Sequence, residues 1–223
     1  LSKATKLNMK KTIIFDLDGT LLDSLPSLAK SFNWALEKMG HPRHSFSNYR
    51  YIIGDGAQEG AKRCLPRGNQ ESKEVAKCLS LFRQAYGTYW KEAKPFPHIQ
   101  DMLDIASKES HLAVLSNKDD AFTRSCVEKF FPDTFDLIRG YKPEHGLKPE
   151  PSALLEIARS LGYLASKTYM IGDTATDIKT ATNAGAKSIG VLWGYRDRGE
   201  LSEAGADHIV ASVGKLNDLF ARL

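Results

Sequence analysis

The sequence predicts an α/β fold: a Rossmann-like, doubly wound parallel sheet forms the core, and a small helical cap domain is inserted into it. Two observations predict this architecture. From residue 98 onward, apolar strand patterns alternate with helical patterns, which is typical of a parallel sheet covered on both faces. Residues 24–94 carry helical patterns without a strand pattern. Because a crossover between two parallel strands needs far fewer residues, we expect an inserted domain there.

The expected core comprises residues 9–23 and 95–223, and the expected cap comprises residues 24–94. Lys94-Pro95-Phe96-Pro97 interrupts the helical pattern, so it is a candidate hinge between the two domains. Residues 1–8 precede Met9 and lack the apolar segment of a secretory signal. We expect them to be a tag or a disordered lead, outside the fold.

Each element is predicted from the period of its apolar residues and from the residues that end it. The predicted core strands are 12–16, 111–116, 135–139, 168–172, 187–192 and 208–211, and the predicted core helices are 98–108, 119–131, 150–162, 175–184, 199–204 and 214–222. In the cap, helical spacing predicts a helix from Leu25 that Gly40 ends, short helices within 46–65, and a further helix over 71–93.

The composition is that of a globular protein without a nucleic-acid or membrane partner. Hydrophobic residues make up 42% and charged residues 26% of the chain, and the net charge is +4. No Lys/Arg cluster alternates with aromatic residues, and no run of about 18 apolar residues could span a membrane. Cys64, Cys78 and Cys126 are an odd set without a C-x-x-C pair, which favours a reduced setting. We expect a cytoplasmic monomer or homodimer.

Asp16 and Asp18 stand at the carboxyl end of the strand predicted at 12–16. Open α/β sheets bind their ligands at this edge. Two neighbouring carboxylates repel each other unless a cation or a shared proton stabilises them. The pair therefore indicates a hard metal ion together with nucleophilic or acid–base chemistry. Taken alone, the same residues are also typical of an Asp-Gly turn after a strand.

Three further polar groups stand at corresponding positions. Ser116 and Asn117 end the second core strand, Lys148 precedes a helix, and Asp173 ends a later strand with Asp177 four residues on. Because the carboxyl ends of parallel strands meet at one edge of a sheet, these side chains should converge there with the first two acids. Carboxylates beside a hydroxyl and a lysine predict a Mg²⁺ site next to a phosphate site.

These residues also carry a resemblance to a known family. Asp16-Leu17-Asp18-Gly19-Thr20, Ser116-Asn117, Lys148-Pro149 and Gly172-Asp173-x-x-x-Asp177 resemble, in this order, the four motifs of the haloacid dehalogenase-like superfamily. Ile53-Gly54-Asp55-Gly56-Ala57 with Arg63, Lys148-Pro149-x-Pro151, and Gly194-Tyr195-Arg196-Asp197 with Glu203-Ala204-Gly205-Ala206-Asp207 resemble its phosphoglycolate phosphatase branch.

The resemblance implies a Mg²⁺-dependent phosphomonoester hydrolase that works through an aspartyl phosphate on a small phosphorylated metabolite, with 2-phosphoglycolate the best single candidate. Asp16 would be the nucleophile and Asp18 the general acid and then the base. An Asp in the second position favours phosphoryl transfer over dehalogenation, since an alkyl halide needs no protonated leaving group. Mg²⁺ would be held by Asp16, Asp173 and the backbone carbonyl of Asp18. Asp177 could be a further ligand or could cap the helix that follows.

The phosphate and substrate groups are also assigned from the resemblance. Ser116, Asn117 and Lys148 would bind the phosphoryl oxygens, and Thr20 would hydrogen-bond within the same site. In the cap, the residues implied for substrate specificity are Gly54, Asp55, Gly56 and Arg63. The branch usually carries Asn where this chain has Asp55, so a carboxylate there would disfavour an acidic leaving group unless Arg63 or Lys62 compensates.

Other functions fit the same motifs. A broad sugar-phosphate or nucleotide phosphatase would share the mechanism and differ only in its cap. A phosphomutase of the β-phosphoglucomutase kind would need cap residues that orient a bisphosphate, and we find no clear set. A module that binds a phosphorylated ligand without turnover usually loses a catalytic carboxylate, whereas this chain keeps all four.

Overall fold

The computed structural model describes residues 11–223, so the lead expected at residues 1–8 lies outside the described part. Six strands form one sheet in the order β5-β4-β1-β6-β7-β8, and every neighbouring pair is parallel. They are β1 (Lys11–Phe15), β4 (Ser110–Asp119), β5 (Leu137–Tyr141), β6 (Thr168–Gly172), β7 (Lys187–Val191) and β8 (His208–Val210). The predicted α/β fold is therefore confirmed.

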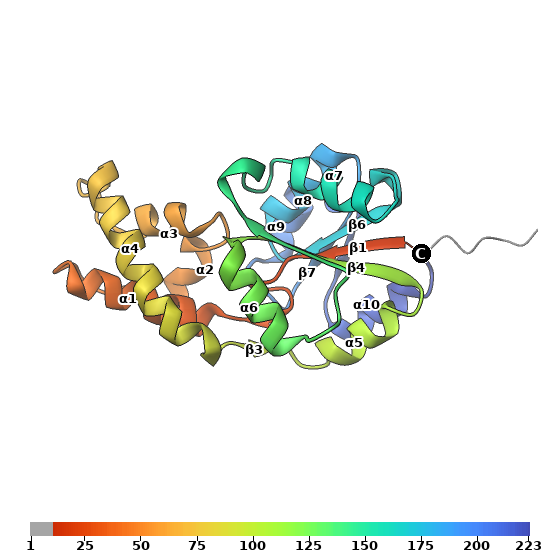
Figure 1. Cartoon of the computed structure of the whole chain (residues 1–223), viewed down its shortest axis with the longest axis horizontal. Helices are drawn as coiled ribbons and strands as arrows, with labels where there is room; N and C mark the ends of the chain where they lie inside the picture. Colours follow the sequence, from red (N-terminus) through yellow and green to blue (C-terminus); the bar gives the residue numbers. More distant parts are fainter. Residues whose placement is uncertain (1–10) are drawn as a thin grey trace, which may run out of the picture.

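Helices cover both faces of this sheet (Figure 1). They are α5 (Ile99–Ala106), α6 (Asp120–Phe130), α7 (Ser152–Ser160), α8 (Ala175–Ala184), α9 (Arg198–Glu203) and α10 (Val213–Phe220), with short 3₁₀ turns at Pro143–His145 and Ala165–Lys167. Alternate residues of β1 face opposite layers, as the strand period requires. Phe15 packs with residues of α5, α6 and α10, whereas Ile14 packs with residues of α7 and α8.

Four helices lie together to one side of the sheet (Figure 1). They are α1 (Leu25–Lys38), α2 (Tyr49–Ile52), α3 (Ala57–Cys64) and α4 (Ser72–Tyr89), with 3₁₀ turns at Phe46–Asn48 and Trp90–Glu92. They share a core of their own, in which the Phe32 and Phe82 rings stack with centroids 3.9 Å apart. The chain leaves and re-enters the α/β part through an antiparallel pair, β2 (Leu22–Asp23) and β3 (Lys94–Pro95). The domain limits at 23/24 and 94/95 stay a prediction.

Two elements differ from their predicted limits in ways that matter for the site. The strand predicted at 111–116 continues to Asp119, because a register shift after Leu115 lets Asp119 pair with Tyr141 of β5. Lys118 therefore lies on β4 and not in a loop. The strand predicted at 135–139 lies two residues further on, because the Asp136 side chain accepts a hydrogen bond from the backbone N–H of Leu112 before the strand begins.

Two neighbouring leucines of α7 test the packing of the sheet. Leu154 is fully buried against the sheet, whereas Leu155 is 39% exposed. Leu154→Ala should lower the free energy of unfolding by about 2–5 kcal/mol, because it leaves a cavity in a close-packed layer. Leu155→Ala should change it by about 0.5 kcal/mol or less. Urea unfolding of both variants measures the difference, and equal losses would contradict this packing.

Candidate active site

The predicted site residues meet at the carboxyl edge of the sheet, above its central strands. Asp16 directly follows β1, and its backbone N–H continues the ladder by donating to the carbonyl of Ile171 in β6 at 2.8 Å. Asp173 directly follows β6. Because β1 lies between β4 and β6, the polar ends of all three strands are neighbours. The convergence expected from the parallel topology is therefore present.

Asp16, Asp173 and Asp177 form a buried acidic cluster, in which one carboxylate oxygen from each lies within 4.8 Å of the others. The Lys148 ammonium contacts two of them, at 2.8 Å from Asp16 and 2.6 Å from Asp177. Burial is the largest cause that raises the pKa of Asp16 to about 7, and together with the neighbouring acids it outweighs Lys148. Burial, Asp177 and Asp16 raise the pKa of Asp173 well above its usual value. The cluster therefore holds protons more tightly than isolated carboxylates do, and a further cation could take the place of those protons.

Hydrogen bonds hold the carboxylates of Asp173 and Asp177 in place. Asp173 accepts from the Thr20 hydroxyl at 3.2 Å and from the backbone N–H of Tyr195 at 2.7 Å. Asp177 accepts from the backbone N–H and the hydroxyl of Thr174, at 3.1 and 2.8 Å. Of the two roles considered for Asp177, capping of α8 is thus observed. Gly172 is required here, because a Cβ at this position would overlap the Asp177 carboxylate.

The Asp18 side chain has different partners from the acidic cluster. Both of its oxygens accept hydrogen bonds from the Lys118 ammonium, at 2.8 and 2.7 Å, and one also accepts from the Ser24 hydroxyl at 2.5 Å. Lys118 is not among the site residues predicted from the sequence. Its position directly after Ser116-Asn117 could have indicated a site residue. The predicted strand ended at residue 116, however, so Lys118 was not expected at the edge of the sheet where the site lies.

The residues predicted to bind phosphate lie around Asp16, and several already have partners in the protein. Ser116 accepts from the backbone N–H of Lys118 at 3.2 Å. The Asn117 side chain accepts from the backbone N–H of Lys148 at 2.7 Å and donates to the carbonyls of Lys148 and Gly54, each at 3.2 Å. The Thr20 hydroxyl donates to Asp173. The side chains of Asn117 and Thr20 therefore position the site, and their contact with phosphate stays a prediction.

In the predicted specificity loop, Gly54 and Gly56 line a cavity above Asp16, whereas Asp55 is not among the lining residues. The Asp55 carboxylate accepts from the Thr176 hydroxyl of α8 at 2.8 Å and pairs with Arg63 at 2.7 Å. Burial alone would raise the pKa of Asp55, but the hydrogen bonds from Thr176 and Arg63 outweigh it and lower the pKa. Arg63 thus compensates the Asp55 carboxylate, which removes the reason to expect discrimination against acidic leaving groups.

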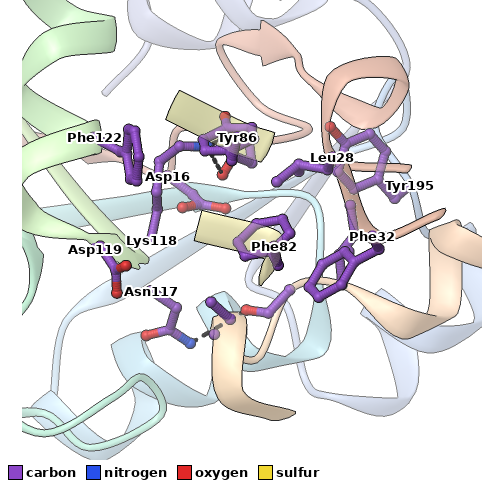
Figure 2. A pocket seen from close by; sticks show the side chains of 15 residues that line it. Asp16, Leu28, Phe32, Phe82, Tyr86, Asn117, Lys118, Asp119, Phe122 and Tyr195 are labelled. Carbon is purple, nitrogen blue, oxygen red and sulfur yellow. Dashed lines mark hydrogen bonds and ion pairs between the residues drawn. The ribbon is translucent and has the colours of Figure 1, made fainter. Parts of the chain in front are cut away.

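The cavity lies between the sheet edge and the four helices of residues 25–89 (Figure 2). Asp16, Asp18 and Lys118 lie on its polar side. Its other walls are mostly apolar and include the side chains of Leu28, Phe32, Phe82, Tyr86 and Phe122. Such a cavity above a buried carboxylate has the features of a small-molecule site.

The chain was compared with known proteins and structures. It matches the family model described as haloacid dehalogenase-like hydrolase over residues 13–191. The phosphoglycolate phosphatase of Vibrio parahaemolyticus is 30% identical, over 95% of this chain and 96% of its own length. The phosphoglycolate phosphatase of Pseudomonas fluorescens is 28% identical, over 93% of this chain and 79% of its own. A crystal structure from Lactobacillus delbrueckii subsp. bulgaricus, at 31% identity, covers 95% of this chain and 99% of its own with a TM-score of 0.88.

Within residues 11–223, no helix combines the length and the apolar character needed to cross a bilayer. The family match takes in the strands that carry Asp16, Ser116 and Asp173, and the relatives align over most of the chain. The chain therefore belongs to the haloacid dehalogenase-like hydrolase family.

Proposed function

We propose that this protein is a Mg²⁺-dependent phosphatase that hydrolyses a small phosphomonoester through an aspartyl phosphate on Asp16. The observation that carries the proposal is the buried cluster of Asp16, Asp173 and Asp177, which gathers three carboxylates beside one lysine. An aspartyl-phosphate mechanism needs a nucleophilic carboxylate beside cations that hold the phosphoryl group. The relatives named phosphoglycolate phosphatase support the same activity.

In the first step, a carboxylate oxygen of Asp16 attacks phosphorus and the bond from phosphorus to the leaving oxygen breaks. Asp18 donates a proton to that oxygen, so that the product leaves as an alcohol. In the second step, Asp18 takes a proton from a water molecule whose oxygen attacks phosphorus. The Asp16–phosphate bond then breaks and inorganic phosphate leaves, which restores the Asp16 carboxylate and leaves Asp18 protonated for the next turnover. Asp16 and Asp18 both line the cavity, so both carboxyl groups can reach a substrate bound there.

The donor set fits Mg²⁺. The three acids offer hard oxygen ligands, and no His or Cys belongs to this cluster. Asp16 and Asp173 would hold the ion together with the backbone carbonyl of Asp18, and Asp177 could add a ligand directly or through water. When bound, the ion would neutralise charge on the carboxylates and the phosphoryl oxygens. Lys148 already lies between Asp16 and Asp177, where its ammonium can stabilise both the free nucleophile and the phosphorylated one.

For the substrate we propose 2-phosphoglycolate, from the names of the relatives and from the compensation of Asp55 by Arg63. Discrimination would come from the cap of residues 24–94, because Asp16, Ser116 and Lys148 are proposed to contact only the phosphoryl group that all substrates share. The runner-up is a broad sugar-phosphate or nucleotide phosphatase with the same chemistry. Rates for a panel of phosphomonoesters, ranked by kcat/KM in the presence of Mg²⁺, separate the two.

Removal of the nucleophile tests the mechanism. Asp16→Asn should lower phosphate release by about 10³-fold or more, because the amide cannot form the covalent intermediate. The variant should remain folded, since it removes a charge that burial disfavours. Phosphate release and thermal melting are measured together, with Asp101→Asn as the control because that acid is exposed. Near-normal turnover by folded Asp16→Asn would exclude a phosphoenzyme at this residue.

The raised pKa of Asp16 predicts a pH-dependent effect of Mg²⁺ on stability. The folded pKa of about 7 lies above the ordinary value of 3.8. The stability contributed by this group is therefore present in full below pH 3.8 and is lost as the pH rises toward 7. Mg²⁺ competes with the proton, so its stabilisation should be larger at pH 8 than at pH 5. At pH 8 and about 100 times its Kd, it should add about 2.7 kcal/mol, or about 5–10 °C in Tm.

Thermal melting with Mg²⁺ or EDTA at both pH values measures this effect. Asp173→Asn serves as the matched variant, because it removes one expected ligand and should abolish most of the increase. The site is misassigned if Mg²⁺ raises Tm equally at both pH values, or equally in the Asp173→Asn variant.

A further inference from the structure

Lys118 is the one cation among the described residues that line the cavity. Its side chain is 6% exposed, and its ammonium lies 2.7 and 2.8 Å from the two oxygens of Asp18. Asp18 is the residue proposed to protonate the leaving oxygen. The ammonium is therefore within one hydrogen bond of the group that must meet the leaving oxygen. Any charge carried by the leaving group close to its ester oxygen would face Lys118 first.

The other charged groups lining the cavity are acids with partners of their own. Asp16 is paired with Lys148, and Asp119 is paired with Arg83 at 2.7 Å. Neither Lys148 nor Arg83 lines the cavity. An ammonium has three N–H groups, and the hydrogen bonds to Asp18 account for two of them. Lys118 can therefore contact a further anion without giving up Asp18 entirely.

Tyr86 supplies an independent observation. It lines the same cavity and is 1% exposed, and its hydroxyl has no hydrogen-bond partner within the described part of the chain. A buried hydroxyl without a partner is costly and is expected to serve a ligand or a water. The Lys118 ammonium lies 4.7 Å from the centre of the Tyr86 ring, so both groups face the same part of the cavity. Figure 2 shows the two side chains beside each other.

We propose that Lys118 and the Tyr86 hydroxyl form a subsite for a carboxylate carried by the leaving group, on the carbon that bears the ester oxygen. The subsite rests on the proposed phosphatase function. One carboxylate oxygen would accept from the ammonium and the other from the hydroxyl, which satisfies the unpaired group. The preferred substrates would be phosphate esters of small 2-hydroxy acids.

The surroundings favour a carboxylate over the alternatives. The walls near Lys118 include Phe82 and Phe122, so a charged group entering there loses water and needs a partner of matching charge. Asp18 must carry a proton to act as the general acid, and in that state it does not offset the charge of Lys118. One ammonium and one hydroxyl then match a single negative charge. A second phosphate group carries about two charges near neutral pH, and the described lining offers it no second cation. A neutral polar leaving group would leave the third donor of Lys118 and the Tyr86 hydroxyl without an anionic acceptor.

Two isosteric substrates test the subsite. The ratio of kcat/KM for 2-phosphoglycolate over that for 2-hydroxyethyl phosphate compares a carboxylate with a neutral group of similar size on the same alkyl ester. The native protein should favour 2-phosphoglycolate by about tenfold or more, the effect of a charge-assisted hydrogen bond. Ethylene glycol bisphosphate presents a second phosphate in place of the carboxylate, and it should be the poorer substrate of the two anions.

Three variants locate the effect. Tyr86→Phe should reduce the ratio by about tenfold without lowering Tm, because the hydroxyl has no partner to lose in the free protein. Lys118→Met should abolish the preference, and Lys118→Arg should restore part of it. Lys30 and Tyr89 are matched controls, because Lys30 likewise pairs with an acid, Glu92, and lies 4.0 Å from the Tyr89 ring, outside this cavity. Lys30→Met and Tyr89→Phe should leave the ratio unchanged.

The outcomes distinguish this subsite from the function on which it rests. If the native protein hydrolyses no phosphomonoester with Mg²⁺, including 4-nitrophenyl phosphate, the proposed function fails. If its kcat/KM for the neutral ester or for the bisphosphate equals that for 2-phosphoglycolate, the proposed phosphatase function stands and the carboxylate subsite is wrong. The subsite is also wrong if Lys118→Met and Tyr86→Phe lower both rates equally, since that result indicates that these residues only position Asp18.

Discussion

The repulsion among three buried carboxylates is the constraint on which the rest of this structure depends. Asp16, Asp173 and Asp177 are brought together by the strand order, and Lys148 offsets only part of their charge. Burial of such groups is unfavourable unless hydrogen bonds and cations compensate. The loops around them supply those hydrogen bonds, and Gly172 lets the chain pass close enough to make them. The position of Lys148 between Asp16 and Asp177 is the part of this compensation that comes from a charged side chain.

The sheet and the acidic cluster could be predicted because their signals are local. Runs such as 12–16 are apolar on both faces, and a parallel sheet brings their ends to one edge whatever the helices between them contain. Asp16 and Asp173 are therefore neighbours by topology alone. The strand limits were less certain where pairing overrides propensity. Leu115 ends the apolar pattern, yet the strand continues to Asp119 because β5 offers a partner there.

The cavity above the cluster could not be predicted, because it depends on contacts across long stretches of the sequence. Lys118 pairs with Asp18, 100 residues earlier, and no period in the sequence signals this contact. Asp55 belongs to the loop that was expected to face the substrate. Its carboxylate pairs with Arg63 and accepts a hydrogen bond from Thr176, which lies 121 residues further on. Ion pairs of this kind can be identified only from the packed structure, because no pattern in the sequence indicates which charged residues meet.

The Asn117 side-chain amide connects two parts of the protein, the loop that carries Lys148 and the loop at Gly54. Its oxygen and one of its donors hold the backbone of Lys148, while its amide nitrogen also donates to the carbonyl of Gly54 in the helical part of the chain. Any movement that withdraws residue 54 from the sheet edge removes one restraint on the side chain that orients the lysine. The position of residue 54 beside the cavity and the position of the Lys148 ammonium beside Asp16 are thus linked through one side chain.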